Sequence, residues 1–410
     1  MNITLQKSQI ANRQSKITVT GSKSESNRLL LLKALFPTIT LDNVSNSDDS
    51  CLMTDALKST SNLVDIHHAG TAMRFLTAYF SVQEGREVTL TGSKRMKERP
   101  IKILVEALQE LGAEIEYVEN SGFPPIKITG KKLTKNKVSL QANVSSQYIS
   151  ALLLMASKLE NGIELTLEGE ITSVPYIKMT LALLDEIGVE STFIGNTITV
   201  KPAASTQQPR TLTVESDWSS ASYYFSIAAL CEVGTEITLS SYKENSLQGD
   251  SVLVEIYKSF GVETTFENNA MTLVKAVNVN PESIIEFDLA NAPDIAQTIA
   301  VTCFALGMAC NLTGLHTLKI KETDRLVALK TEIEKLGGQV NITDKSLHLL
   351  RSTVIKEYVP IGTYNDHRMA MAFAPLALKT PIVIEDAEVV SKSYPTFWDD
   401  LESIGFKITK

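Results

Sequence analysis

One phrase recurs along the chain and limits the folds it can adopt. Each copy is an apolar segment with helical spacing that closes on an apolar residue and a glycine, followed by a segment typical of a strand. LVEALQELGAEIEY is one copy, and LKTEIEKLGGQVNI is another. The closing glycines, which suit the residue after a helix C-terminus, are Gly112, Gly188, Gly261, Gly337 and Gly405.

The spacing of these glycines gives the size of the repeating unit. Successive positions differ by 76, 73, 76 and 68 residues. Each unit also holds a second helix candidate, such as QYISALLLMASKL, and strand candidates such as IELTLEG. The pattern predicts an α/β (α+β) protein of βαβαββ units, with a sixth, degraded unit beginning at TLDNVSNSDDSCLMTDALKS. Units this large favour two globular domains of three units each, with a crossing near QQPRTLTVESD.

Composition excludes several classes of protein. Among 410 residues, 39 are Lys or Arg and 47 are Asp or Glu, which gives a net charge of −8 and argues against nucleic acid as a partner. The absence of a run of 18 apolar residues or a secretory leader argues against a membrane and predicts a cytoplasmic protein. The cysteines lack metal-ligand spacing, so we expect reduced, buried thiols at Cys51, Cys231, Cys303 and Cys310.

Two predicted helices in the first half begin with small and cationic residues. GSKSESNRLLLLKAL leads into a helix near Lys23, Ser24 and Arg28, and HHAGTAMRFL opens a second helix at Gly70. Backbone N–H groups at a helix start attract anions, so both segments suit a phosphate or a carboxylate. Capping residues with solvated charges are the ordinary alternative.

Two more segments of the same half suit an anion. The basic run GSKRMKERP ends near Arg99, which Pro100 would hold in a stiff turn at a helix start. In VSSQYIS, Ser145 and Ser146 are good capping residues, and together with Gln147 they also suit a phosphate.

The second half carries three similar segments. IKETDRLVAL places Lys321 and Arg325 four residues apart on an expected helix, with Glu322 beside them. YNDHRMAM opens an apolar helix with a polar triplet that ends at Arg368, and Lys392 precedes a proline-started helix. A salt-bridged surface helix is the ordinary alternative for the first of these.

Two acidic residues open apolar helices. Asp366 suits a helix cap. Asp294, in ANAPDIAQTIAVTCFALG, is either an acid favoured by the helix dipole or a general base at a desolvated site. If the helix starts of the two domains face each other, the cations beside them form one cleft for small polyanions.

Other chemistries find little support in the sequence. The pair His67–His68 suggests a metal, but no carboxylate or cysteine at suitable spacing completes a site. A Ser or Cys triad and a dinucleotide-binding loop are also missing, so we expect no metal and no cofactor.

These motifs together resemble the 5-enolpyruvylshikimate-3-phosphate synthase family of enolpyruvyl transferases. GSKSESNR, AGTAMR, RMKERPI, SSQ, PDIAQTIA, KETDRL and YNDHRMAM follow in the family's order across the whole chain. The resemblance implies a two-domain inside-out α/β barrel with three βαβαββ repeats in each domain. One domain would comprise residues 1–20 and 216–410, the other 21–215, with the active site in the cleft between them.

The resemblance also implies a reaction without metal or organic cofactor. The 5-hydroxyl of shikimate 3-phosphate adds to C2 of phosphoenolpyruvate, C3 is protonated, and the tetrahedral intermediate then loses phosphate. We expect a monomer whose partners are these two small molecules.

The family's roles carry over to matching residues of this chain. The catalytic residues would be Asp294 as acceptor of the hydroxyl proton, Glu322 for proton transfer at C3, and Lys23 and Lys392. The shikimate 3-phosphate ligands would be Lys23, Ser24, Arg28, Ser145, Ser146, Gln147, Ser173, Asp294 and Lys321. The phosphoenolpyruvate ligands would be Lys23, Gly70, Arg99, Gln147, Arg325, Arg368 and Lys392.

This chain departs from the family pattern at a few positions. His68 stands where many members have Asn before Ala-Gly-Thr, Phe75 replaces a frequent Pro, and Thr317 replaces a frequent Asn or His. Gly70 is kept, so the resemblance implies sensitivity to glyphosate.

Two other functions stay open at this point. A UDP-N-acetylglucosamine enolpyruvyl transferase usually carries a reactive cysteine in a mobile loop, whereas SKRMKERP has none. A non-catalytic phosphometabolite-binding protein on the same fold would need the phosphate ligands but not Asp294, Glu322 and Lys392, all of which are present.

Overall fold

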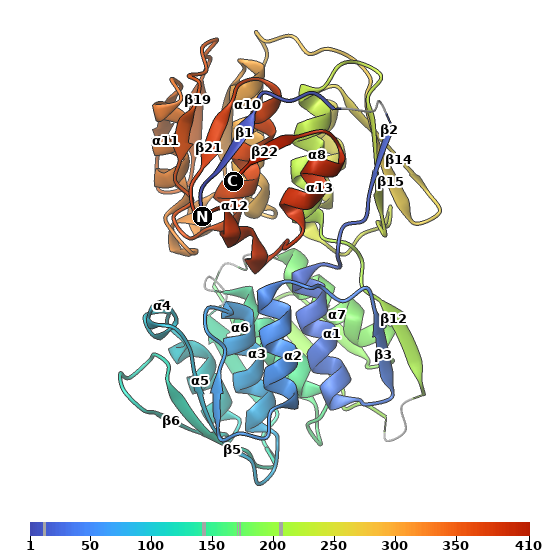
Figure 1. Ribbon diagram of the computed structural model, residues 1–410. Helices are drawn as coiled ribbons and strands as arrows, with labels where there is room; N and C mark the ends of the chain where they lie inside the picture. Colours follow the sequence, from blue (N-terminus) through green and yellow to red (C-terminus); the bar gives the residue numbers. More distant parts are fainter. Residues whose placement is uncertain (11–13, 142–144, 170, 172–173, 205–207) are drawn as a thin grey trace. The chain divides into compact units, whose positions relative to one another are not determined.

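The computed structural model describes residues 1–10, 14–141, 145–169, 171, 174–204 and 208–410. The chain forms two compact units (Figure 1). The continuous unit is Gly21–Val214, and the discontinuous unit joins Met1–Thr20 to Glu215–Lys410.

The continuous unit contains two complete βαβαββ repeats, each with a four-stranded sheet. The first consists of β4 (Leu63–Asp65), α3 (Gly70–Ser81), β5 (Glu87–Thr91), α5 (Lys102–Glu110), β6 (Glu114–Tyr117) and β7 (Ile126–Thr129), with the short α4 (Lys94–Lys97) after β5. The second consists of β8 (Lys137–Gln141), α6 (Ser146–Ala156), β9 (Ile163–Glu168), α7 (Val174–Glu186), β10 (Ser191–Ile194) and β11 (Thr197–Val200). In both, the first two strands pair parallel and the last two form an antiparallel hairpin.

The third repeat of this unit is the degraded one. It consists of α1 (Lys23–Leu35), β3 (Ile39–Asp42) and α2 (Asp48–Lys58), and β3 pairs parallel with β12 (Arg210–Thr213) from the far end of the unit. Within the part of the chain that the structure describes, this sheet has two strands and no closing hairpin. The sequence prediction of five clear units and one degraded unit is therefore confirmed.

The discontinuous unit contains three complete repeats. The first consists of β2 (Gln14–Ile17), α8 (Trp218–Leu230), β13 (Glu236–Ser240), α9 (Leu253–Lys258), β14 (Val262–Glu267) and β15 (Ala270–Lys275). The second consists of β16 (Ile284–Asp288), α10 (Ala296–Leu306), β17 (Ala309–Thr313), α11 (Arg325–Lys335), β18 (Gln339–Ile342) and β19 (Leu347–Leu350). The third consists of β20 (Val359–Ile361), α12 (His367–Phe373), β21 (Ile382–Ile384), α13 (Phe397–Ser403), β22 (Lys407–Thr409) and β1 (Ile3–Gln6). The N-terminal segment supplies two of these strands, because β1 pairs with β21 and β22 while β2 pairs with β13.

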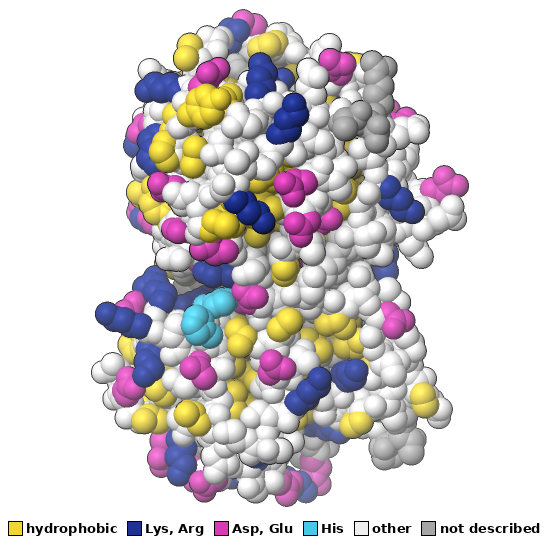
Figure 2. Space-filling view, in the orientation of Figure 1, with side chains coloured by type: hydrophobic (Ala, Val, Ile, Leu, Met, Phe, Trp, Pro, Cys, Tyr) yellow, Lys and Arg dark blue, Asp and Glu magenta, His cyan; other side chains and the backbone are white. Residues whose placement is uncertain are grey.

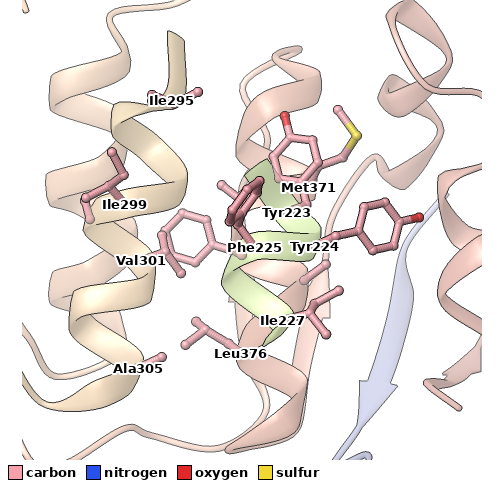
Figure 3. Close-up of a cluster of buried hydrophobic side chains, with 14 of the residues drawn as sticks. Tyr223, Tyr224, Phe225, Ile227, Ile295, Ile299, Val301, Ala305, Met371 and Leu376 are labelled. Atoms are coloured by element: carbon pink, nitrogen blue, oxygen red, sulfur yellow. The ribbon is translucent and has the colours of Figure 1, made fainter. Parts of the chain in front are cut away.

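Each unit places three helices inside its sheets. In the discontinuous unit these inner helices are α8, α10 and α12, whose residues are nearly all buried. Figure 3 shows Phe225 of α8 beside Val301 of α10, and both belong to one continuous core. Burial of a side chain such as Phe225 contributes about 1.5–3 kcal/mol. The continuous unit uses α1, α3 and α6 in the same way. This arrangement confirms the predicted inside-out α/β architecture.

The closing glycines end the outer helices as expected. Gly112 and Gly337 both have φ of 106°, which is the left-handed region that glycine adopts without strain. At Gly261 a Cβ would also collide with the carbonyl oxygen of Val277, so this site has no room for a side chain.

The expected burial of all four cysteines is wrong for one of them. Cys303 and Cys310 are buried and Cys231 is partly buried, but Cys51 is exposed. Ser50 and Met53 are buried on the inner face of α2, whereas Cys51 lies on its outer face. Among the helices that the structure describes, none has both the length and the apolar character needed to span a membrane.

Candidate functional site

The starts of the inner helices of the continuous unit converge. Gln147 Nε2, at the start of α6, donates a hydrogen bond to Thr71 Oγ1 at the start of α3 (3.0 Å). Lys23 Nζ, at the start of α1, lies 3.6 Å from Asp49 Oδ2, and His68 Nε2 lies 3.5 Å from Asp49 Oδ1. Three positive helix ends therefore face one place, which favours an anion there.

Arg28 lies within this end of the unit and is buried. Its Nε donates to Thr180 Oγ1 (2.8 Å), its Nη2 to Ser150 Oγ (3.0 Å) and its Nη1 to the carbonyl of Ser24 (2.8 Å). Burial lowers the pKa of the Arg28 guanidinium to about 10, although the nearby Tyr176 and Glu25 act in the opposite direction. The charge is therefore held in a dry place that would gain from a nearby anion.

Arg99 lies over the start of α3. A Cβ built on Gly70 would stand 2.5 Å from Arg99 Nη1, so only glycine permits this approach. Arg74 supports the same corner, since its guanidinium donates to the carbonyls of Gly70 (2.9 Å) and Pro100 (3.3 Å). Burial and the neighbouring Arg99 lower the pKa of Arg74 to about 10. The expected helix start at Pro100 is wrong by two residues, because α5 begins at Lys102.

The two serines at the start of α6 have different roles, and only the first is a capping residue. Ser145 is the N-cap and its hydroxyl accepts from the backbone N–H of Gln147 (3.3 Å), while Ser146 is buried in the first turn. Ser24 lies in the first turn of α1, where it is partly buried. Ser173 lies outside the described residues.

The discontinuous unit presents a second cluster around Asp294. This residue lies in a short 3-10 turn (Pro293–Ile295) that leads into α10. Its carboxylate is 2.8 Å from Arg325 Nη1, 3.3 Å from Lys321 Nζ and 3.4 Å from Arg368 Nη2. Burial alone would raise the pKa of Asp294, but the three cations hold it well below its usual range.

Arg325 is the centre of this cluster and is almost completely buried. Its Nε donates to Asp366 Oδ2 (2.6 Å) and its Nη2 donates to Glu322 Oε2 (2.8 Å), in addition to the bond with Asp294. Burial would lower the pKa of Arg325, yet these three carboxylates raise it above the ordinary value. Asp366 also caps α12, as expected, by accepting from the backbone N–H of Arg368 (2.9 Å).

One prediction about this segment is wrong. Lys321 and Arg325 do not share a helix, because α11 begins at Arg325 and Lys321 is extended. The reason is Asp324, whose side chain caps the N–H groups of Leu326 and Val327 and so fixes the helix start. Lys321 and Arg325 still meet at Asp294 through this turn.

Lys392 and Glu322 lie at the edge of the same cluster. Lys392 Nζ donates to the carbonyl of Asn365 (2.6 Å), next to the cap of α12. Tyr364 and Asn365 both have positive φ, 54° and 56°, so this turn is held in a strained conformation beside Arg368. Glu322 reaches Arg325 from a partly buried position.

Several residues of the two clusters escaped the sequence analysis. Asp250 is buried and receives a hydrogen bond from Ser219, which in turn accepts one from Arg368 Nη2 (3.2 Å). Burial and the charge of Asp294 raise the pKa of Asp250 to about 6. Asp49, in the segment SDDS, also has no role predicted from the sequence. Neither carboxylate has a sequence signal, because each becomes important only through a partner distant in the chain.

The structure also bears on the metal hypothesis for His67–His68. The two Nδ1 atoms are 2.8 Å apart, so the rings share a hydrogen bond with each other. Within the described residues, no group of three or more His, Cys, Asp or Glu side chains is placed to hold a metal ion.

Comparisons with known proteins identify the family. The family model described as EPSP synthase (3-phosphoshikimate 1-carboxyvinyltransferase) matches residues 58–401. The chain belongs to this family. A curated relative of the same name from Bacteroides fragilis is 46% identical over 402 residues and covers 96% of each chain. The relative from Haemophilus influenzae is 35% identical over 426 residues, covering 96% of this chain and 97% of its own.

Two solved structures share the fold. EPSP synthase from Acinetobacter baumannii matches with a TM-score of 0.81 over 100% of both chains at 21% identity. The enolpyruvyl transferase NikO from Streptomyces tendae matches with a TM-score of 0.72 at 12% identity, over 100% of this chain and 98% of that one. At these identities the likeness supports the inside-out architecture and nothing finer.

Proposed function

We propose that this chain is a 3-phosphoshikimate 1-carboxyvinyltransferase whose active site is formed by the helix starts of both units. It transfers the enolpyruvyl group of phosphoenolpyruvate to the 5-hydroxyl of shikimate 3-phosphate in the shikimate pathway. The observation that carries the mechanism is the Asp294 carboxylate held among three cations at the start of α10. The two units, divided at Thr20 and Glu215, then serve as its two domains.

The reaction proceeds by addition and elimination. The oxygen of the 5-hydroxyl bonds to C2 of phosphoenolpyruvate, its proton passes to Asp294, and C3 gains a proton from Glu322 with Lys23 and Lys392 assisting. The intermediate then loses a proton from C3 as the bond between C2 and the phosphate oxygen breaks. Enolpyruvylshikimate 3-phosphate and inorganic phosphate leave, and no metal or organic cofactor is required.

The low basicity of Asp294 in the structure suggests why binding must precede proton transfer. Three cations stabilise its carboxylate and hold its pKa well below the usual range. When a substrate phosphate and carboxylate take up Arg325, Arg368 and Lys321, part of that stabilisation moves to the ligand. The pKa of Asp294 then rises toward a value useful for a general base.

The substrate contacts divide between the two units. The continuous unit would hold shikimate 3-phosphate through Lys23, Ser24, Arg28, Ser145, Ser146, Gln147 and Ser173, and the discontinuous unit through Asp294 and Lys321. Phosphoenolpyruvate would lie among Lys23, Gly70, Arg99, Gln147, Arg325, Arg368 and Lys392. Charge-assisted hydrogen bonds from arginine suit both carboxylate and phosphate. The working form would be a monomer in the cytoplasm.

The decisive test is phosphate release by purified protein with both substrates in the presence of EDTA. Release that needs both substrates, with a new enolpyruvyl ether detected by NMR, is the expected result. Folded protein that releases no phosphate, or that stops in EDTA, would contradict the proposal. UDP-N-acetylglucosamine tested as acceptor separates the related transfer reaction.

A further inference from the structure

His68 and Asp49 connect the surface of the continuous unit to Lys23. His68 Nε2 lies 3.5 Å from Asp49 Oδ1, and the other carboxylate oxygen of Asp49 lies 3.6 Å from Lys23 Nζ. Asp49 is 8% exposed, so the Lys23 ammonium and the His68 imidazole share a carboxylate that has little access to water. The position of the Lys23 ammonium therefore depends on what His68 does to Asp49.

The second nitrogen of His68 is also engaged. Its Nδ1 lies 2.8 Å from His67 Nδ1, and the backbone N–H of His67 donates to Asp65 Oδ1 (2.7 Å), which fixes the preceding turn. With both ring nitrogens facing partners, a protonated His68 can donate to His67 and Asp49 together, whereas a neutral His68 can donate to one of them only. A proton on His68 is therefore coupled to the charge of the Asp49 carboxylate.

The charged groups around this pair come from several elements. Asp49 belongs to α2 and Lys23 to α1, while Arg99, after α4, lies over Gly70, two residues beyond His68. Lys94 and Arg95 follow Ser93, whose backbone N–H donates to the carbonyl of His67 (2.8 Å). Acidic groups also lie at this end, since Glu25 is in the first turn of α1 and Glu98 pairs with Arg95 (3.1 Å), and the cations beside them suit an anion. The imidazoles reach the surface, where they appear cyan in Figure 2.

Protonation of His68 changes the charge that an anion meets at Lys23. When His68 is neutral, Asp49 is paired chiefly with Lys23 and cancels part of its charge. When His68 is protonated, it takes over one side of Asp49, so the ammonium of Lys23 is released toward an anion and the local charge rises by one. An imidazole changes its charge near pH 6.5, within the range in which enzymes work.

We propose that His68 is a positioning residue that acts through Asp49 to control how strongly Lys23 binds the anionic substrates. The inference rests on the proposed function only in naming those substrates. An anion held by Lys23 and a proton on His68 favour each other, because each removes part of the other's electrostatic cost. Substrate binding is therefore linked to uptake of a proton by this chain.

The first test compares His68→Asn with the parent enzyme from pH 5.5 to pH 8.5. Asn keeps a hydrogen-bond donor but carries no proton that titrates. The substrates' own phosphate groups titrate near pH 6, so the ratio of the two enzymes at each pH is the informative quantity. We expect the parent to have about three- to tenfold higher kcat/KM than His68→Asn at pH 5.5, mainly through KM, and near equality at pH 8.5.

Two matched variants guard the interpretation. His348→Asn removes a histidine that hydrogen-bonds Asn311 and Ser346 in the other unit, and should leave the profile unchanged. Asp49→Asn removes the carboxylate that joins His68 to Lys23. In that background, the ratio of kcat/KM without and with His68→Asn should no longer depend on pH. A ratio between parent and His68→Asn that is constant across pH would overturn the proposal, whatever its size.

The second test does not require turnover. The chain has only 5 histidines, so the His68 ring signal can be assigned by its loss in His68→Asn and followed by NMR against pH. Addition of inorganic phosphate or shikimate 3-phosphate should move the titration midpoint of His68 to higher pH. If neither anion moves the titration midpoint of His68, the inference is contradicted even in an active enzyme. If the midpoint shifts in a protein that does not release phosphate, only the proposed reaction is contradicted.

Discussion

The two clusters of the molecule hold their arginines in opposite ways. In the discontinuous unit, Arg325 is surrounded by three carboxylates, and its pKa is raised. In the continuous unit, Arg28 and Arg74 are equally buried, but their described partners are hydroxyl, carbonyl and thioether atoms, and burial lowers the pKa of each to about 10. Arg325 is therefore compensated by close ion pairs, whereas the hydrogen bonds given for Arg28 and Arg74 end on neutral acceptors, with Glu25 as a nearby charge for Arg28.

This difference suggests that the two units contribute differently to binding and to chemistry. A buried guanidinium held mainly by neutral acceptors gains more from an incoming anion than one already in close ion pairs, so the continuous unit suits firm binding of a phosphate. In the discontinuous unit a substrate bound as we propose would have to compete with the protein's own carboxylates, and the competition would change the basicity of Asp294. The first unit would thus provide affinity and the second would couple binding to chemistry.

The largest expected effect comes from removing Asp294, the proposed proton acceptor in the discontinuous unit. Asp294→Asn should lower kcat by about 10²–10⁴-fold, because a positioned proton acceptor is lost. Steady-state phosphate release measures this, and Asp344→Asn, a surface carboxylate, serves as the control. A change of less than about threefold in kcat, small beside the usual gain from acid–base catalysis, would show that Asp294 is not the base.

A stability comparison should separate the two kinds of arginine. Arg325→Met leaves three carboxylates without their partner and should cost about 3–5 kcal/mol of unfolding free energy. Arg28→Met leaves its hydroxyl and carbonyl acceptors unpaired and removes one charge near Glu25, and it should cost about 1–3 kcal/mol. Urea denaturation of both variants measures the difference. Equal losses would mean that the carboxylates around Arg325 do not distinguish the two clusters.

A single methyl group at Gly70 should displace Arg99 in the continuous unit. In Gly70→Ala the new Cβ would stand 2.5 Å from Arg99 Nη1, so the guanidinium must move. Loss of one charge-assisted hydrogen bond to phosphoenolpyruvate should raise its KM by about 10- to 100-fold. The KM of shikimate 3-phosphate is the internal reference. If both KM values stayed unchanged, Arg99 would not be a ligand.

The smallest expected effect concerns pH and two carboxylates of one cluster. The pKa of Asp250 is raised to about 6, so its contribution to stability is greatest below pH 3.8 and is lost as pH rises to about 6. The pKa of Asp294 is lowered, so its contribution is present above pH 3.8 and is lost as pH falls below that value. The two carboxylates therefore respond to pH with opposite sign.

Asp250→Asn tests this sign. Relative to the parent, the variant should gain about 1–3 kcal/mol of unfolding free energy between pH 4.5 and pH 6.5. Urea denaturation at the two pH values gives the change, and Asp344→Asn again serves as the reference. A relative stability that falls over this range would contradict the raised pKa of Asp250.

The local patterns of the sequence were sufficient for much of the fold. The closing glycines and apolar helices predicted the repeats, and capping chemistry predicted that Ser145 and Asp366 precede helices. They were insufficient where a turn competes with a helix. The spacing of Lys321 and Arg325 suggested one helix, but Asp324 caps the chain between them. Whether a short segment continues a helix depends on contacts that spacing does not record.

The sequence by itself determined the repeat architecture, the family and the positions at which charged residues open helices, because these depend on neighbours along the chain. The tertiary structure decided which charges meet. Asp294 meets Arg325 and Arg368, which lie 31 and 74 residues away along the chain. Arg28 points to Thr180 in another repeat. Such contacts, and the pKa values that follow from burial beside them, arise only when packing brings distant segments together in a dry interior.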